Sequence, residues 1–116
     1  MTRSKFYRKD GLLRGFILEG HSGAGEAGAD IVCAAVSSAA YMTANTLTEV
    51  MGCRAFAADG EGRMAVFPAQ ADLARCQELL QGFRLHMEGL QEQYPRNISV
   101  ETVEGDCPAE YVKGRV

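Results

Sequence analysis

Between residues 73 and 94, apolar positions recur at alternating steps of three and four, the spacing that places side chains on one face of a helix. The stripe consists of Leu73, Cys76, Leu80, Phe83, Met87, Leu90 and Tyr94. It is too short for a sustained coiled coil, so we expect a helix that packs against a sheet. Pro68 is placed to open this helix and Pro95 to end it.

Three other stretches carry the signals of β-strands. Residues 4–19 predict two strands joined at Asp10-Gly11, a pair that suits the positive backbone dihedrals of a tight hairpin turn. A second hairpin is predicted over residues 53–68, with its turn in the sequence DGEG. Residues 97–103 alternate between two sets of side chains and predict a final strand.

A helix rich in small residues is predicted between the two hairpins. Asp30 fits the N-cap position because its carboxylate can accept hydrogen bonds from the first amides of a helix. The helix is expected from about Ile31 to Met51, and Gly52 is a suitable stop signal. Its apolar face consists of Val32, Val36, Ala39, Ala40, Leu47 and Val50.

The element order is therefore strand, strand, helix, strand, strand, helix, strand. Because hairpins dominate this order, we expect an α+β fold: a two-layer sandwich in which two helices pack on a mainly antiparallel sheet. Residues 1–104 are predicted to form a single domain. Residues 105–116 show no clear period and are expected to be a tail that is loop or partly disordered.

Composition and charge narrow the classes of function. The net charge of -3 argues against direct binding of nucleic acid, which usually requires a basic surface. No apolar run approaches the roughly 20 residues that span a bilayer, and the N-terminus lacks the apolar region of a secretory signal, so we expect a cytoplasmic protein without a membrane partner. Its four cysteines, which form no C-x-x-C pair, should be reduced there and predict neither a metal site nor a cofactor.

The stretch GHSGAGEAGADIVC, residues 20–33, has two interpretations. Gly23, Gly25 and Gly28 have the dinucleotide-binding spacing G-x-G-x-x-G. That motif requires a parallel strand after the helix, whereas a hairpin is predicted here, and Glu26 would repel a pyrophosphate.

The second interpretation of this stretch is a Cys/His pair. With Asp30 as N-cap, Cys33 would lie in the first turn of the helix, where the helix dipole and a nearby cation lower a thiol pKa. His21 ends the preceding strand and could lie close to Cys33, as a base beside a nucleophile. A cysteine at a helix start can equally be a small buried residue, and this alternative stays open.

The segment GHSGAGEAGADIVCAAVSS resembles the signature of the bacterial ribosomal-processing cysteine proteases, in which a Gly-His pair is followed by a loop that ends in Gly-x-Asp-Ile-Val-Cys-Ala. TANTL at 43–47 and LQEQYPRNISVE at 90–101 are also similar to the family. The resemblance covers about residues 5–103, and Ser22 replaces the alanine that is usual after the Gly-His pair. It implies a small α/β sandwich that is usually a homodimer, which makes residues 1–104 a cysteine-protease domain.

The resemblance also implies a reaction. Cys33 would be the nucleophile and His21 its general base, in an endopeptidase that removes a short N-terminal extension from large-subunit ribosomal protein number twenty-seven, after a Phe-Phe pair. The partner would then be that ribosomal protein precursor. Residues expected to bind substrate or support the site are Gly20, Ser22, Glu26, Gly28, Asp30 and Ser37. The alternative is a non-catalytic ribosome-associated module that binds its partner while Cys33 is merely buried.

Overall fold

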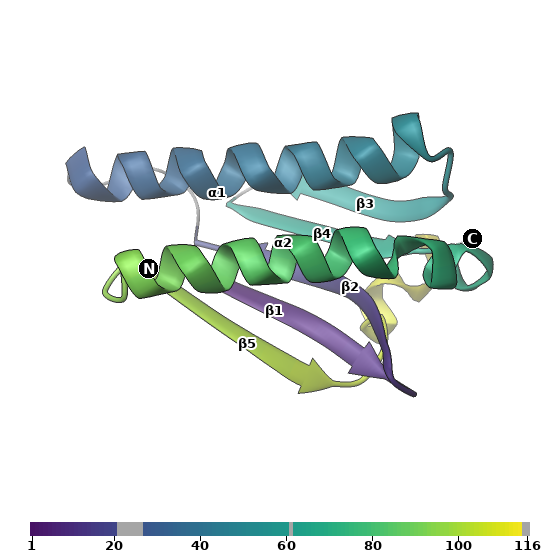
Figure 1. The fold of residues 1–116 in the computed structure, drawn as a ribbon. Helices are drawn as coiled ribbons and strands as arrows, with labels where there is room; N and C mark the ends of the chain where they lie inside the picture. The colour runs from purple at the N-terminus through teal and green to yellow at the C-terminus, as the bar shows by residue number, and fades with distance from the viewer. Residues whose placement is uncertain (21–26, 61, 115–116) are drawn as a thin grey trace.

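The structure is a computed structural model that describes residues 1–20, 27–60 and 62–114. Five strands form one sheet, and two long helices lie side by side on one of its faces (Figure 1). The element order and the two-layer α+β architecture agree with the sequence prediction. The sheet strands are β1 (Thr2–Lys9), β2 (Leu12–Glu19), β3 (Ala55–Gly60), β4 (Arg63–Pro68) and β5 (Ile98–Glu104).

The sheet is mainly antiparallel, as predicted. Its strand order is β3-β4-β2-β1-β5, and β1 with β5 is the one parallel pair within the described part of the chain. The first hairpin turns at Asp10 and Gly11, whose φ angles of 54° and 77° confirm the expected tight turn with two left-handed residues. The last strand thus returns to the open edge of β1 rather than extending the second hairpin.

Helix α1 (Ala27–Asn45) begins earlier than predicted and continues into a π-helical turn, Thr46–Val50. Asp30 therefore lies inside the helix, and its prediction as N-cap was wrong. The physical reason is that an aspartate suits the first turn of a helix as well as the N-cap, because a carboxylate there complements the positive end of the helix dipole. Gly52, with φ of 67°, follows the end of the helix as predicted.

Helix α2 (Leu73–Gln93) follows a short 3-10 helix, Gln70–Asp72. Pro68 closes strand β4 and does not open this helix, which corrects the expected start. The predicted stripe does face the sheet: Leu73, Cys76, Leu80, Phe83 and Met87 are buried, and Leu90 and Tyr94 pack against the same core. The periodic pattern was therefore the mark of a core-facing helix.

The main core fills the space between the sheet and the helices. The ring of Phe83 on α2 packs edge-on against Phe16 at 4.7 Å and against Phe6 at 5.5 Å between centroids. Each such pair contributes roughly 0.5–1.5 kcal/mol beyond its buried area. Helix α1 reaches the same core through Val32, Val36 and Ala40. Both helices are thus held by one continuous apolar layer.

The opposite face of the sheet carries a smaller apolar cluster. It consists of Ile17, Ala65, Phe67 and Cys107, with Tyr7, Phe56 and Tyr111 packed against it. Cys107 and Tyr111 belong to the region after β5, which forms a 3-10 helix at Ala109–Gly114, shown in yellow in Figure 1. The sequence offered no periodicity for this region, yet its residues cover part of the second face.

One segment of α1 is apolar enough to resemble a membrane span. The segment Ile31–Val50 has 20 residues and a mean hydropathy of 1.2 over an 18-residue window, so its length and composition are those of a membrane-spanning helix. The expectation that no apolar run approaches this length was therefore wrong. The core helix of a globular domain can have the same length and composition. Within the window 28% is buried, and Val32, Val36 and Ala40 are among the residues that pack against the sheet.

Candidate active site

The residues predicted for the site fall into two groups. His21, Ser22 and Glu26 lie outside the described residues, so the distance between His21 and Cys33 stays a prediction. Gly28 and Asp30 lie in the first turn of α1, and Cys33 and Ser37 follow on the same helix.

Gly20 forms the base of the segment that carries His21. Its φ is 78°, and its amide donates a 2.9 Å hydrogen bond to the carbonyl oxygen of Gly62 in the β3–β4 turn. A Cβ atom at this position would lie 2.4 Å from the carbonyl oxygen of Met1. The chain can therefore leave β2 along this path only because the residue is a glycine.

Cys33 differs from the other three cysteines, all of which lie in the described part of the chain. It is half-buried, whereas Cys53, Cys76 and Cys107 are 5%, 0% and 8% exposed. Burial and a 3.6 Å contact with the Cys53 sulfur raise the pKa of Cys76 to about 12. Cys33 is thus the cysteine that a substrate reaches most easily.

The position of Cys33 in the helix changes the chemical argument. It is the seventh residue of α1, in the second turn rather than the first. The field of a helix terminus acts mainly within the first turn, and the amides of α1 without helical acceptors are those of residues 27–29. The expected effect of the helix start on the Cys33 sulfur is therefore weaker than the sequence suggested.

One face of α1 runs from Cys33 through Ser37 to Tyr41, since residues four apart share a face. The Tyr41 hydroxyl donates a hydrogen bond to the Asp59 carboxylate on β3. That bond raises the pKa of the Tyr41 phenol. Tyr41 thereby links the C-terminal half of α1 to the edge strand β3. No sequence signal pointed to the contact between Tyr41 and Asp59, which lie 18 residues apart.

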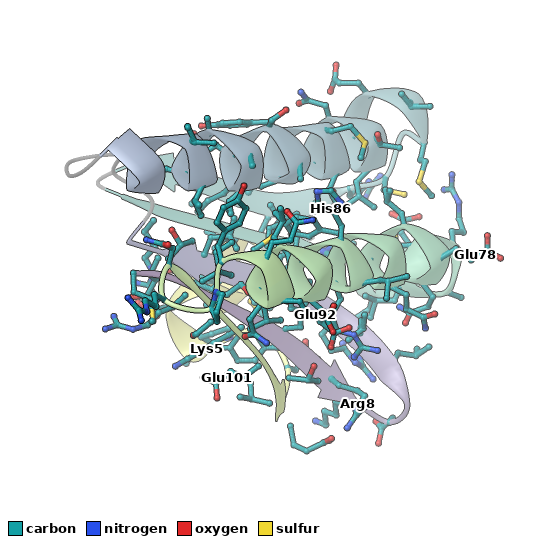
Figure 2. The ribbon with its side chains drawn as sticks, turned by 60° about the vertical axis from the view of Figure 1, so that its left-hand side comes forward. Lys5, Arg8, Glu78, His86, Glu92 and Glu101 are labelled. Carbon is teal, nitrogen blue, oxygen red and sulfur yellow. The ribbon has the colours of Figure 1, made fainter. Side chains whose placement is uncertain are left out.

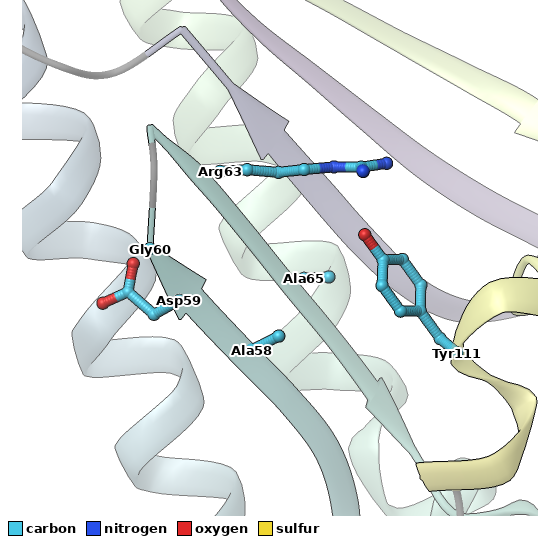
Figure 3. Close-up of a pocket in the computed structure, with 6 residues that line it drawn as sticks. All are labelled: Ala58, Asp59, Gly60, Arg63, Ala65 and Tyr111. Atoms are coloured by element: carbon cyan, nitrogen blue, oxygen red, sulfur yellow. The ribbon is translucent and has the colours of Figure 1, made fainter.

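Two pockets lie near this region. A groove of about 590 Å³ runs between α1 and α2, and its wall includes Ala39, Met42, Phe83 and His86. His86 is exposed as the sequence suggested, and it points from α2 toward α1 (Figure 2). A pocket of about 320 Å³ lies on the other face of the sheet. Its lining residues are Ala58, Asp59, Gly60, Arg63, Ala65 and Tyr111 (Figure 3).

The topology argues against dinucleotide binding. That fold needs a strand after the glycine loop and helix that lies parallel to the first strand and next to it. Here β3 follows α1 and runs parallel to β2, but β4 lies between them and pairs with β2 in the antiparallel sense. Within the described ranges, no three His, Cys, Asp or Glu side chains gather as metal ligands would.

Solved structures share this fold. The protein SMU.848 from Streptococcus mutans is 28% identical, with a TM-score of 0.79 over 90% of this chain and 96% of that one. The essential ribosomal processing protease Prp from S. aureus, in complex with a substrate peptide, is 23% identical, with a TM-score of 0.81 over 89% of this chain and all of that one. The same protease with a covalently linked product peptide gives 24% and 0.77.

Among curated proteins, none matches this sequence significantly. A family model described as "Cysteine protease Prp" does match, over residues 1–99. This match includes both helices, the glycine-rich segment and Cys33. Because it spans most of the 116 residues, the chain belongs to the cysteine protease Prp family.

Proposed function

We propose that this chain is the endopeptidase that removes the N-terminal extension of large-subunit ribosomal protein number twenty-seven, with Cys33 as nucleophile and His21 as general base. The observation that carries the proposal is the exposure of Cys33 in a member of a cysteine protease family, while the three other cysteines are buried. The S. aureus relative, a ribosomal processing protease with a substrate peptide bound, supports the class of substrate.

Two described elements flank the segment that carries His21. Gly20 is held against the β3–β4 turn, and His21 is the next residue. Helix α1 begins at Ala27, and Cys33 lies about 9 Å further along its axis. The proposal requires that the His21 imidazole lie beside the Cys33 sulfur, and the cleavage assays of the two single variants test this pairing.

The proposed reaction is acyl transfer to sulfur. His21 takes the Cys33 proton, the thiolate attacks the scissile carbonyl carbon, and the C–N bond breaks as His21 returns the proton to the leaving amine. Water then hydrolyses the thioester and frees the enzyme. The amides of residues 27–29 have no acceptor within the helix, and the proposal assigns the oxyanion to donors of this kind at the start of α1. Loss of one such donor typically lowers the rate by about 10²–10³.

The decisive experiment uses a peptide that carries the extension with its Phe-Phe pair. The wild-type chain should cleave it, and Cys33→Ala should not. Cys53→Ala is the matched control, because it removes a buried thiol of equal size and should leave cleavage intact. Since the chain has only two histidines, His21→Ala should abolish cleavage while His86→Gln retains it. Binding of the peptide without cleavage by the wild type would instead identify the non-catalytic module.

The proposal also includes a homodimer in the cytoplasm, where the thiols remain reduced. Exposed apolar side chains on α1 and on the π-helical turn that follows it support a contact between two copies: Ile31, Met42 and Val50 are 65%, 57% and 79% exposed. Sedimentation equilibrium of the wild type should give twice the mass of 12.5 kDa. A monomer at all concentrations would contradict this part of the proposal.

A further inference from the structure

The region after β5 covers a face of the sheet that the two long helices leave open. Cys107 is buried there against Ile17, Ala65 and Phe67. The Tyr111 ring stacks on Phe56 at 4.8 Å between centroids. The family match ends at residue 99, so residues 105–111, hereafter the C-terminal segment, lie beyond it. The segment has a defined place in this fold outside the matched residues.

Arg63 connects the C-terminal segment to the sheet. Its guanidinium lies over the Tyr111 ring, 5.5 Å from the centroid, and one of its nitrogens is 3.5 Å from the Glu110 carboxylate. Figure 3 shows Tyr111 directed from the C-terminal segment toward Arg63. The Nε atom of Arg63 is buried and has no hydrogen-bond partner within the described residues. The orientation of the guanidinium therefore depends on Tyr111 and on its two carboxylate neighbours.

The second carboxylate neighbour is Glu19, the last residue of β2. The same Arg63 nitrogen is 4.0 Å from a Glu19 oxygen, and the two residues are register partners across β2 and β4. The next pair along the chain is also joined, because Gly20 donates its amide hydrogen bond to Gly62. Arg63 thus connects the C-terminal segment to the residues that immediately precede His21.

We propose that the C-terminal segment positions the end of β2 for the reaction, with Tyr111 and Glu110 acting through Arg63 on Glu19 and Gly20. Tyr111 holds the guanidinium by its ring face, and Glu110 and Glu19 share its charge. Without the segment, the end of β2 loses one side of this arrangement. This proposal rests on the proposed function. It assigns Tyr111, Glu110 and Arg63 as positioning residues, none of which touches the substrate.

The test compares Tyr111→Ala with Tyr111→Phe in peptide cleavage at a temperature well below the unfolding transition of each variant. Tyr111→Phe keeps the ring that faces Arg63 and should retain wild-type kcat. Tyr111→Ala should lower kcat by about two- to fivefold, the range expected for one partly exposed cation–π contact, with KM little changed. Arg63→Gln removes this contact together with both carboxylate contacts and should lower kcat at least as much. The double variant should lose little more than Arg63→Gln alone, since Tyr111 acts through Arg63.

A second readout does not require activity. The chain contains two histidines, so the imidazole NMR signals of His21 and His86 can be assigned from His86→Gln alone. Tyr111→Ala should shift or broaden the His21 signals and leave His86, on α2, unchanged. Tyr111→Phe should leave both unchanged.

The outcomes separate this inference from the proposed function. If the wild type cleaves the peptide but Tyr111→Ala has wild-type kcat and wild-type His21 signals, the segment is only structural and the inference is overturned, even if the variant melts at a lower temperature. If the wild type does not cleave at all, the proposed protease activity fails. In that case the His21 signals still decide whether the segment positions the end of β2.

Discussion

Gly20 and Gly52 offer a matched test of how the chain leaves β2. Both have left-handed backbone angles, with φ of 78° and 67°. A Cβ at Gly52 would meet no atom within 4 Å, whereas a Cβ at Gly20 would lie 2.4 Å from the carbonyl oxygen of Met1. The two substitutions to alanine therefore share the backbone penalty and differ in the contact.

The magnitudes follow from these two terms. A left-handed alanine costs about 1–2 kcal/mol, offset by about 0.4–1 kcal/mol from the less flexible unfolded chain, so Gly52→Ala should cost about 1 kcal/mol. Gly20→Ala adds an overpacking cost of about 1–3 kcal/mol. The Met1 carbonyl cannot simply retreat, because the next residue, Thr2, donates a 2.8 Å hydrogen bond to Asn97. We expect Gly20→Ala to lose about 2–4 kcal/mol in total.

The assay combines thermal denaturation with peptide cleavage. At about 4 °C per kcal/mol, Gly52→Ala should melt about 4 °C below the wild type and Gly20→Ala about 8–16 °C below it. Only Gly20→Ala should also lower kcat, because it displaces the residue before His21. Equal stability and equal kcat in the two variants would refute the close approach of Gly20 to Met1 and its role as an anchor.

Other contacts make further predictions. Gly15→Ala should lower the free energy of unfolding in urea by about 2–5 kcal/mol, because its Cβ would lie 2.3 Å from a backbone oxygen of β4. Gly82→Ala, on the open side of α2, should raise it by about 0.5–1 kcal/mol. Similar effects of the two variants would contradict this contrast. At pH 8, iodoacetamide should label Cys33 before Cys76, as peptide mapping would show. Cys76 has a pKa of about 12, so only about one Cys76 thiol in ten thousand is ionised at this pH. Equal labelling rates would count against an accessible Cys33. The raised pKa of Tyr41 means that its hydrogen bond stabilises the fold fully below pH 10 and that this contribution disappears as the pH rises through the folded-state pKa. Tyr41→Phe should therefore flatten the alkaline part of the pH–stability curve, and an unchanged curve would refute this origin.

Local rules accounted for the features that depend on neighbouring residues. The turn at Asp10-Gly11 follows from the preference of that pair for positive φ, and the buried face of α2 follows from a stripe with helical period. The start of α1 was missed because an aspartate such as Asp30 suits the first turn of a helix as well as the N-cap. Such competing preferences differ by less than 1 kcal/mol per residue, which is too little to define a boundary from sequence.

The amino-acid sequence alone thus determined the order of the elements and the face that α2 buries, because period and turn residues act over a few positions. Val50, predicted on the apolar face of the first helix, is instead 79% exposed. Only the tertiary structure decided that β5 joins β1 in parallel, that Tyr41 contacts Asp59 and that Tyr111 reaches Arg63. These pairs lie far apart in the sequence. Each depends on the summed burial of the whole core, which brings distant segments together and leaves no local pattern by which to recognise the partners.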